Sequence, residues 1–582
     1  MSRPIIGITT NLGSKGAELA EGYWRSIEIA GGTPMLLVPT DDSATLISQV
    51  EQLDGLLLSG GGDINPILIG EEPIPELGGI NPRRDTYELQ LLEEALHRSI
   101  PVLGICRGMQ VVALGCGGKV AQDMAVWWSR HPEAMRDADT GSLLKHSQDA
   151  PRDCATHHVT VKEGTMLHDF VETTRFAVNS FHHQAVVHPG SLTVSATAAD
   201  GCIEAIESRA AMSFVMGVQW HPECLGDVFS QRIFRRFVQE AAIFCRALNL
   251  HASITTLDSH CDTPMTFDAA LKAHGGDEKA ALDYTDKRHE SDGTAYLVDA
   301  ERMDAGHLDE VFMVSYIPQG PRTPEGYAVA RSMVEETYRR MDMMEEVTPG
   351  LRGRIHRGIE NGYALGTDLS LVAHYKKMGC EYITLCHNGH NDLCDSAKPK
   401  PGEPQAEHGG LSPLGREMVR EMNRQHMLID VSHAAEKTVL DVLECSERPV
   451  AVTHTCCRDL RNHPRNLSDR VLKAVAERGG VVQCTMYRDF VALDHPEAYG
   501  ISPADNASVL TFMVHLEHLI SLCGIDHVGI GSDFDGDGGV AGLEDASRMI
   551  GITVRLLKAG YSDDEICKIW GDNFRRVLCG SR

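Results

Sequence analysis

The second half of the chain contains eight short apolar segments that alternate with helical patterns, and this alternation constrains the fold more than any other feature. The segments read ITTLDS, VFMVSY, GRIHRGI, YITLC, LIDVS, VAVTH, VVQCTM and HVGIGS. Amphipathic stretches such as PLGREMVREMNRQ separate most of them. Strand–helix units in this number are what a (β/α)8 barrel requires. We therefore expect residues 252–582 to form one such barrel.

Polar side chains follow these predicted strands at the points where the strands end. Active sites of (β/α)8 barrels form at the C-terminal ends of the strands, so we expect these side chains to converge on one mouth. A single histidine at a strand end is usually structural, whereas so many at successive strand ends predict a functional site. The residues after the first, third, fourth, fifth, sixth and eighth strands are His260 with Asp262, Glu360, His387, His433, His454 and Asp533.

Five of these residues predict a dinuclear metal centre. His260 and Asp262 lie two residues apart on an extended segment, so both side chains point the same way. Nitrogen and carboxylate ligands suit Zn²⁺. His433 and His454 come from neighbouring strands and can bind a second ion, while the two oxygens of Glu360 can bridge both ions. Two ions roughly 3.5–4 Å apart can deprotonate a shared water and polarise a scissile carbonyl, so we expect two zinc ions per chain.

The first half of the chain also alternates strands and helices. The apolar segments PIIGIT, PMLLVP, GLLLSG and PVLGI are separated by amphipathic stretches such as TYELQLLEEALHR. This alternation indicates a parallel sheet covered by helices on both faces. The pattern changes after the helical stretch QRIFRRFVQEAAIFCRAL, and a chain of 582 residues is long enough for two domains. We place the first domain at residues 1–248.

A cysteine in the first domain lies where a nucleophile would be expected. The segment PVLGICRGMQVVALGCGG is typical of a strand, a sharp turn and a helix, with Cys106 at the turn between Gly104 and Gly108. This is the pattern of a nucleophile elbow, and the following helix N-terminus favours a thiolate. Such a nucleophile needs a base and a group that orients the base. The segment MGVQWHPE offers His221 and Glu223, so the three residues predict acyl transfer through a thioester.

An acyl-enzyme also needs donors that stabilise an oxyanion. The glycines Gly60, Gly61 and Gly62 of LLLSGGGDINP follow a predicted strand and can aim backbone N–H groups at a developing negative charge. Arg107, directly after the nucleophile, would contribute another N–H. The alternative to a catalytic site is that Cys106 is a buried structural cysteine, His221 a surface histidine and Gly60–Gly62 an ordinary turn. Each of these is common by itself, but all three would have to occur together.

Residues 1–247 resemble the class I glutamine amidotransferase superfamily, and more closely its peptidase C26 branch of γ-glutamyl hydrolases. The resemblance is carried by SGGGDINP, NPRRDTYEL, GICRGMQ, VNSFHHQAV and GVQWHPE, a set specific to the γ-glutamyl-γ-aminobutyrate hydrolase-like group. It implies a flavodoxin-like three-layer αβα fold, with Cys106 as nucleophile, His221 as base and Glu223 as its orienter. The implied reaction is hydrolysis of a γ-glutamyl amide bond. The sequence contains no GxxxxGK[ST] phosphate loop, which favours a free-standing hydrolase over a partner of an ATP-dependent synthetase.

Residues 254–582 resemble the renal, or membrane, dipeptidase family, peptidase M19. The matching segments are DSHCDTP, GIENGYALG, YITLCHN, LIDVSH, VTHTC, HPRNLSD, HVGIGSDFDG and GYSDDEICKIWGDNFRRVL, in family order. The resemblance implies that one zinc ion is bound by His260, Asp262 and Glu360. It implies that the other is bound by Glu360, His433 and His454.

The same resemblance assigns three further roles and shows one departure. It implies that His387 stabilises the tetrahedral oxyanion and that Asp533 passes a proton to the leaving amine. Arg465 would bind the free carboxylate of the substrate, a bidentate task for which arginine is suited. Asn361 and Tyr363 stand in GIENGYALG where the family commonly has Gly and His, which puts the tuning of the nearby metal site in question.

The charge and the cysteine content limit which binding partners and which cellular compartment we expect. A formal net charge of −28 argues against nucleic acid or an anionic membrane surface as the main partner. Neither a secretory leader, a membrane span nor an apolar C-terminal tail is legible. Seventeen scattered cysteines, an odd number without a regular framework, fit reduced thiols. We expect a cytoplasmic enzyme, and the family resemblance suggests a homodimer.

Together the two halves indicate a bifunctional hydrolase that acts on small γ-glutamyl compounds and on dipeptides. Removing γ-glutamate from a γ-Glu-X-Y compound leaves the dipeptide X-Y, and glutathione has that shape. In one alternative the domains act independently, the first on γ-glutamylated amines and the second on unrelated dipeptides. In another, one half is a regulatory or assembly module without activity, although every predicted site residue is present in both halves.

Overall fold

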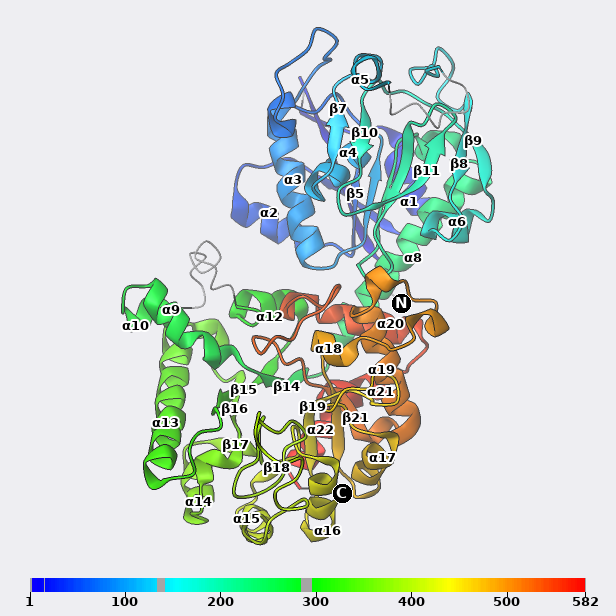
Figure 1. The fold of residues 1–582 in the computed structure, drawn as a ribbon. Coiled ribbons are helices and arrows are strands. Elements are labelled where there is room, and N and C mark those ends of the chain that lie inside the picture. Colours follow the sequence, from blue (N-terminus) through cyan, green and yellow to red (C-terminus); the bar gives the residue numbers. More distant parts are fainter. Residues whose placement is uncertain (1–2, 15, 133–141, 284–295, 581–582) are drawn as a thin grey trace. The chain divides into compact units, whose positions relative to one another are not determined.

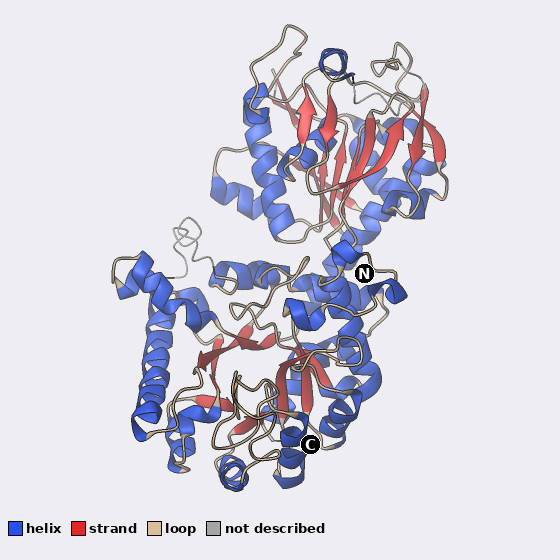
Figure 2. Cartoon of the chain, viewed as in Figure 1, coloured by secondary structure: helices blue, strands red, loops and turns tan. Residues whose placement is uncertain are grey.

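The computed structural model describes residues 3–14, 16–132, 142–283 and 296–580, and it divides into two compact units, residues 1–247 and 248–582 (Figure 1). Each unit has a large sheet of its own, surrounded by helices (Figure 2). No disulfide joins the seventeen cysteines, all of which lie in the described ranges. Among the described residues, no helix is both long and apolar enough to cross a membrane.

The first unit is a three-layer αβα structure, as predicted. Its nine-stranded sheet has the order β4-β1-β5-β6-β13-β12-β11-β8-β9. The first five strands in that order are parallel: β4 (Thr33–Leu37), β1 (Ile5–Thr9), β5 (Gly55–Leu58), β6 (Val102–Ile105) and β13 (Val215–Val218). The helices that accompany the sheet include α1 (Glu21–Ala30), α2 (Ser43–Val50), α3 (Pro82–His97), α4 (Arg107–Gly115) and α8 (Val228–His251).

The sheet is not parallel throughout, which corrects the expectation from the apolar segments. Four strands extend it in antiparallel fashion: β12 (Ile203–Glu207), β11 (Thr193–Ala198), β8 (His157–Val161) and β9 (Arg175–Val178). Buried and more exposed residues alternate along β8 and β9 instead of forming an apolar run. Antiparallel strands with one solvated face commonly show this alternation. A search for continuous apolar segments therefore misses them.

The second unit is the predicted (β/α)8 barrel. Its eight parallel strands follow each other in chain order: β14 (Leu257–Cys261), β15 (Glu310–Tyr316), β16 (Ile355–Glu360), β17 (Cys380–Thr384), β18 (Leu428–Asp430), β19 (Ala451–Thr455), β20 (Val481–Cys484) and β21 (Val528–Ile530). A bridge between Cys261 and Phe534 links the first strand to the segment after the last one. The surrounding helices include α13 (Pro324–Val347), α15 (Pro413–Arg424), α16 (Glu436–Cys445), α17 (Asp469–Glu477), α19 (Val509–Cys523) and α20 (Ile550–Lys558).

Two fully buried carboxylates tie neighbouring strand ends together just below the barrel mouth. Asp258 accepts hydrogen bonds from the backbone N–H groups of His260 (3.2 Å) and Ser532 (2.8 Å), which joins the first strand to the segment after the last. Asp430 accepts from the N–H groups of Ser432 (3.0 Å) and Thr453 (2.9 Å). Asp430 also accepts hydrogen bonds from the hydroxyl groups of Thr384 (2.6 Å) and Thr453 (2.8 Å). Because both carboxylates bind backbone N–H groups of two neighbouring segments, the two side chains fix the spacing of the strand ends.

The opposite end of the barrel carries a histidine held between two carboxylates. His356 on β16 lies 2.7 Å from Glu381 on β17 and 3.4 Å from Glu310 on β15. Burial disfavours the charged ring, but the two carboxylates outweigh it and raise the pKa of His356 to about 9. The imidazolium therefore links three consecutive strands by ion pairs.

The His356→Gln variant is expected to lose stability in a pH-dependent way. The pKa of His356 in the folded protein lies above its value of about 6.5 in the unfolded chain. The ion pairs of His356 therefore contribute fully to the free energy of unfolding below about pH 6.5, and this contribution is lost as the pH rises through about 9. With the solvent screening of a partly exposed group, we expect about 1 kcal/mol at pH 6 and almost none at pH 10. The thermal midpoints of wild type and variant at the two pH values measure the difference. An equal difference at both would contradict the assignment.

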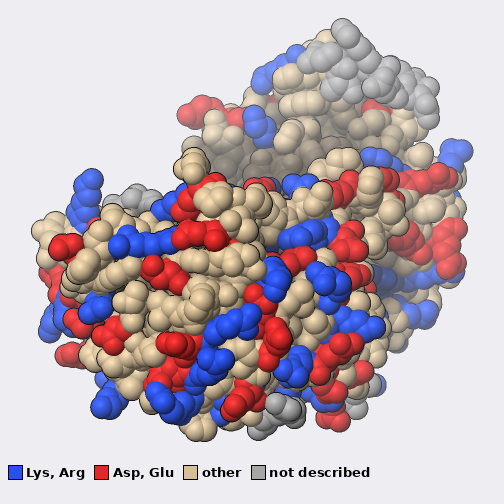
Figure 3. Space-filling view, turned by 60° about the horizontal axis from the view of Figure 1, so that its bottom comes forward, with Lys and Arg blue, Asp and Glu red and all other residues tan. Residues whose placement is uncertain are grey.

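Acidic and basic side chains lie interspersed on the face of the molecule shown in Figure 3. This distribution accompanies a formal net charge of −28 for the whole chain. Mixed charge of this kind is typical of a solvated surface.

Candidate active sites

The mouth of the barrel holds a polar cavity of about 270 Å³. The predicted site residues come together there, because they all follow the C-terminal ends of the strands. The cavity is lined by Asp262, Glu360, His387, His433, Arg465 and Asp533, among others. His260 and His454 lie beside it, almost fully buried.

His260 presents one ring nitrogen to a cluster of carboxylates. Tyr382 donates its hydroxyl hydrogen to the backbone carbonyl of Ser259 (3.1 Å), so it accepts a hydrogen bond from Nδ1 of His260 (2.8 Å). The other nitrogen, Nε2, has no hydrogen-bond partner and lies 3.6 Å from both Asp262 Oδ2 and Glu360 Oε1. Despite burial, the nearby carboxylates raise the pKa of His260 to about 10. This point in the site therefore requires positive charge, which a proton or a metal ion can supply.

Glu360 is the centre of the cluster. Its Oε1 lies 3.0 Å from His433 Nε2, 3.5 Å from His454 Nε2 and 3.6 Å from His260 Nε2. Burial and the charge of Asp262 raise the pKa of Glu360 well above its usual range. Burial and the charge of Arg465 hold the pKa values of His433 and His454 well below theirs. Both rings are thus neutral, as metal-ligating imidazoles must be.

The donor atoms of the cluster fit a zinc pair. Nε2 of His260, Oδ1 of Asp262 and Nδ1 of His433 are buried without a hydrogen-bond partner. The two Nε2 atoms of His433 and His454 lie only 2.9 Å apart. A neutral imidazole carries a single N–H, so only one of the two nitrogens of each ring can donate a hydrogen bond. Three overlapping groups have ligand atoms within 4.8 Å of one another: His260 with Glu360 and His454, Glu360 with His387 and His433, and His260 with Asp262 and Asp533.

Three further residues surround the cluster. Arg465 is almost fully buried, its guanidinium lies over the ring of Phe490 (5.4 Å), and its Nε and Nη2 atoms have no hydrogen-bond partner. Burial and the charge of Asp262 raise the pKa of Asp533 to about 8. Burial and the charge of Arg465 lower the pKa of His387 to about 3. The cavity therefore combines an unpaired cation, a carboxyl that titrates near neutral pH and a neutral imidazole.

The two residues that depart from the family pattern serve the loop after β16. Asn361 has a φ of 95°, accepts a hydrogen bond from the N–H of Tyr363 (3.1 Å) and donates to the carbonyl of Ile317 (2.9 Å). Tyr363 donates its hydroxyl hydrogen to the carbonyl of Pro321 (2.6 Å). Asparagine tolerates such a positive φ better than most residues. Both side chains thus join the loop after β16 to the segment after β15 (Glu310–Tyr316).

In the first unit, Cys106 lies at the predicted turn between β6 and α4. It has a φ of 54° and is almost fully buried. A Cβ atom on Gly108 would collide with the carbonyl oxygen of Leu58, and one on Gly104 with the carbonyl oxygen of Gly108. Only glycine permits this close approach of helix and sheet. The local geometry is that of a nucleophile elbow.

The structure brings Cys106 together with His221 and Glu223. His221 Nδ1 lies 2.7 Å from Glu223 Oε1. Burial disfavours the charged ring, but the Cys106 sulfur and the Glu223 carboxylate raise the pKa of His221 to about 10. The arrangement provides a thiol, a base and a carboxylate that orients the base.

The glycine turn after β5 differs in part from the prediction. The N–H of Gly60 donates to the hydroxyl oxygen of Tyr23 (3.0 Å), which lies 3.5 Å from Nδ1 of His221. Gly60 is therefore corrected from an oxyanion donor to a residue that positions Tyr23, while the N–H groups of Gly61, Gly62 and Arg107 stay predicted donors. Nothing in the sequence pattern singled out Tyr23, because it lies on α1, far from the other site residues in sequence.

A buried network of ion pairs supports this turn. Arg84 on α3 donates to the carbonyls of Ser59 (3.0 Å) and Gly60 (3.1 Å) and pairs with Glu88 (2.9 Å). The side chain of Arg107 pairs with Asp85 and Glu88. The guanidinium of Arg107 is thus held by ion pairs, and its backbone N–H stays the predicted oxyanion donor.

The segment VNSFHHQAV contributes two contacts that the sequence did not reveal. Asn179 accepts a hydrogen bond from the N–H of His221 (2.8 Å) and donates to its carbonyl (3.0 Å), so it fixes the backbone of the predicted base. His183 lies between Asp63 (3.0 Å) and Asp123 (3.2 Å), and these carboxylates raise its pKa to about 9.

Comparison with known proteins separates the chain into the same two parts. Residues 245–580 match the model of the membrane dipeptidase family (Peptidase family M19), and residues 4–223 match the model of peptidase C26. The dipeptidase aclJ of Aspergillus oryzae is 32% identical over 304 residues, which cover 48% of this chain and 69% of that protein. The glutamine amidotransferase-like protein YvdE of Lactococcus lactis is 36% identical over 210 residues, which cover 35% of this chain and 82% of that protein.

Among solved structures, a metallopeptidase from Rhodobacter sphaeroides, liganded with a phosphinate mimic of the dipeptide L-Ala-D-Ala, aligns with 23% identity. The alignment has a TM-score of 0.45 and covers 56% of this chain and 99% of that one.

Proposed function

This chain belongs to the membrane dipeptidase family, peptidase family M19, and on that premise we propose a bifunctional hydrolase that cuts γ-glutamyl peptides in two successive steps. The chain is a hydrolase with a peptidase C26 amidotransferase-like part ahead of the dipeptidase part. The first domain, residues 1–248, removes γ-glutamate. The second, residues 252–582, cleaves the dipeptide that is released.

The barrel residues divide the work of dipeptide hydrolysis. Two zinc ions held by His260, Asp262, Glu360, His433 and His454 would supply an activated water and polarise the scissile carbonyl. Arg465, with unpaired donors at the cavity, binds the free carboxylate of the dipeptide. Neutral His387 donates a hydrogen bond to the oxyanion. Asp533 carries a proton at neutral pH, in keeping with its pKa of about 8, and passes it to the leaving amine.

The first domain acts through a covalent intermediate. The Cys106 thiolate attacks the γ-carbonyl carbon, and the N–H groups of Gly61, Gly62 and Arg107 stabilise the oxyanion. His221 gives its proton to the leaving amine as the C–N bond breaks, which leaves a γ-glutamyl thioester. His221 then takes a proton from water, the hydroxide attacks the thioester, and glutamate leaves as the thiol re-forms. Glu223 holds the ring in place throughout, 2.7 Å from Nδ1.

One observation supports the proposal most: each unit gathers a complete set of reacting groups. In the first unit the base and its carboxylate are in hydrogen-bond contact, and the charges of Cys106 and Glu223 raise the pKa of the base to about 10. In the second, one carboxylate oxygen lies within 3.6 Å of three imidazole nitrogens.

Glutathione tests the successive use of the two sites. Wild-type enzyme is expected to release glutamate, cysteine and glycine, whereas the Asp533→Asn variant releases glutamate and accumulates Cys-Gly because its leaving amine lacks a proton donor. Chromatography of the products over time separates the two patterns. Failure of wild-type enzyme to release glutamate would refute the proposal for glutathione. Release from γ-glutamyl-γ-aminobutyrate alone would instead favour independent activities.

A further inference from the structure

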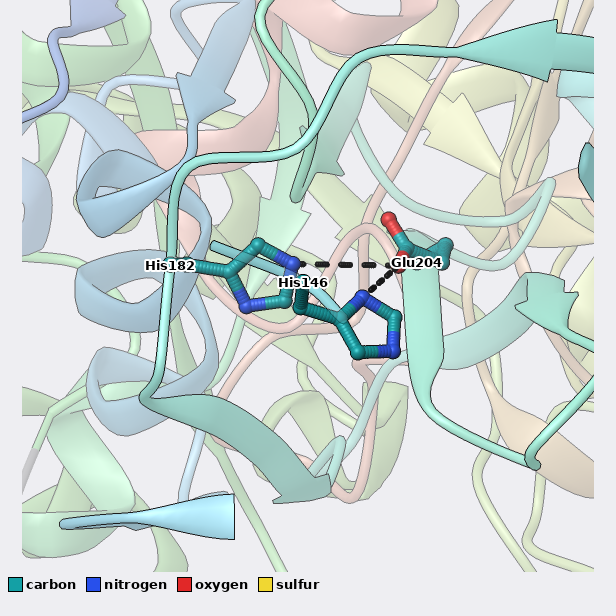
Figure 4. A group of neighbouring side chains, drawn as sticks. All are labelled: His146, His182 and Glu204. Carbon is teal, nitrogen blue, oxygen red and sulfur yellow. Dashed lines mark ion pairs between the residues drawn. The ribbon is translucent and has the colours of Figure 1, made fainter. Parts of the chain in front are cut away.

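A second cluster of buried histidines lies in the first unit, apart from Cys106 and His221. His146 and Glu204 are at most 2% exposed and His182 is 6% exposed. His146 comes from the segment before β8, Glu204 from β12 and His182 from the connection between β9 and β10 (Ala185–His188). Figure 4 shows the two imidazole rings turned toward the Glu204 carboxylate. The ligand atoms of the three residues all lie within 4.8 Å of one another.

The tautomer of His182 directs a lone pair into this cluster. Its Nδ1 lies 2.9 Å from the carbonyl oxygen of Gln184, which can only accept a hydrogen bond, so Nδ1 carries the hydrogen. Nε2 is then unprotonated in the neutral ring. It lies 3.8 Å from Glu204 Oε1 and has no hydrogen-bond partner. Burial of the ring lowers the pKa of His182, which keeps it neutral.

His146 is oriented in the same manner by a carboxylate. Its Nε2 lies 2.9 Å from Asp200, which also accepts backbone N–H groups from Leu144 (3.0 Å) and Cys202 (3.1 Å) and is therefore ionised. His146 Nδ1 faces Glu204 Oε1 at 3.2 Å. The second oxygen of Glu204 is buried without a partner. A neutral His146 would thus direct a second lone pair at an anion that burial already destabilises.

We propose that His146, His182 and Glu204 bind one Zn²⁺ ion, at a site separate from the barrel centre and from Cys106. Two imidazole nitrogens and a carboxylate oxygen are a zinc donor set, and ligands about 2.0–2.2 Å from one tetrahedral ion lie about 3.3–3.6 Å apart. The separations of 3.2 and 3.8 Å found here bracket that spacing. His157 Nε2 lies 3.2 Å from the same Glu204 oxygen, so it packs beside the three proposed ligands.

The groups behind the ligands also match a metal site. Ligating histidines usually donate their second N–H to a carboxylate or a backbone carbonyl, which fixes the ring. Asp200 does this for His146, and the Gln184 carbonyl does it for His182. The competing state is a proton on His146, whose pKa the flanking carboxylates raise to about 9 against the effect of burial. The two states differ in zinc content, which can be measured.

The ion would act as a structural support for the predicted base. The carbonyl of Glu204 accepts a hydrogen bond from the N–H of Gln219 (2.8 Å), two residues before His221. Asn179, which binds the backbone of His221 on both sides, lies three residues before His182. Zinc bound here would therefore join the two segments that hold His221 in place.

Zinc content of the full-length chain tests the proposal. A variant without barrel ligands (His260→Asn with Glu360→Gln) isolates the new site and is expected to retain one zinc per chain after gel filtration. Adding His182→Asn and Glu204→Gln should remove it, whereas adding His158→Asn, an exposed neighbour on β8, should not. If the barrel-ligand variant contains no zinc and has the circular dichroism spectrum of the wild-type protein, the proposal is overturned, whatever the activity of the barrel.

Cobalt gives a second measurement that does not depend on whether the cluster variant folds. The barrel-ligand variant loaded with Co²⁺ should show the visible absorption of a four-coordinate nitrogen–oxygen site at one ion per chain. An octahedral spectrum, or cobalt that a desalting column removes, would mean that the histidines hold a proton and would refute the site.

Discussion

Replacement of Glu360 by glutamine is expected to abolish dipeptide hydrolysis, with kcat/KM reduced by at least about 1,000-fold. One oxygen of this carboxylate lies within 3.6 Å of Nε2 of His260, His433 and His454, so its charge would hold both halves of the predicted zinc pair together. Losing several kcal/mol of stabilisation at the metal site corresponds to a factor of this size. Hydrolysis of Cys-Gly and zinc content, measured on the same preparation, should fall together.

The matched control is Glu417→Gln, which changes an exposed glutamate on α15. This variant should keep both the activity and the metal of the wild-type enzyme. The first domain should also be unaffected by Glu360→Gln, so release of γ-glutamate provides an internal measure of folding. A Glu360→Gln enzyme with full zinc and near-normal Cys-Gly hydrolysis would disprove the bridging role.

The Cys106→Ala variant is expected to lose γ-glutamyl hydrolysis by about 10,000-fold or more, because it lacks the sulfur that forms the proposed thioester. Release of glutamate from a γ-glutamyl anilide measures the loss, and Cys-Gly hydrolysis should remain unchanged. Modification of Cys106 by iodoacetamide should likewise abolish γ-glutamyl hydrolysis and leave Cys-Gly hydrolysis unchanged.

Cys154→Ala is the appropriate control, since Cys154 is an exposed cysteine of the same unit. It should leave the γ-glutamyl activity intact. An enzyme alkylated at Cys106 that keeps its γ-glutamyl hydrolysis would contradict the role of this thiol as nucleophile. Residual activity of Cys106→Ala within tenfold of wild type would remove the thioester mechanism altogether.

The sequence predicts the barrel well because its strands are buried on both faces and read as apolar runs. The polar residues Glu360 and His433 lie at or just after strand ends, where the barrel architecture alone implies that they converge. The elbow of Cys106 is equally legible, since Gly104 and Gly108 are required locally by close packing. Requirements of this kind involve residues close together in the sequence, so they can be recognised without a structure.

Contacts between residues far apart in the sequence could not be predicted from the sequence. Tyr23 meets His221 and Gly60 only after α1 packs on the sheet. The histidines of the proposed zinc cluster follow no fixed spacing, and their tautomers depend on acceptors such as the Gln184 carbonyl. The antiparallel extension of the first sheet was missed for a related reason, because its half-exposed strands lack a continuous apolar signal.

The buried carboxylates of Asp258 and Asp430 preorganise the backbone at the barrel mouth. Their hydrogen bonds end at the backbone of His260 and at the residues directly before Asp533, His433 and His454. The predicted ligands are therefore positioned by folding itself, and metal binding at this site would require little further ordering. Chelation should accordingly give an intact apoprotein that can be reconstituted repeatedly, and the ion it carries will reflect cellular supply as much as geometric selection.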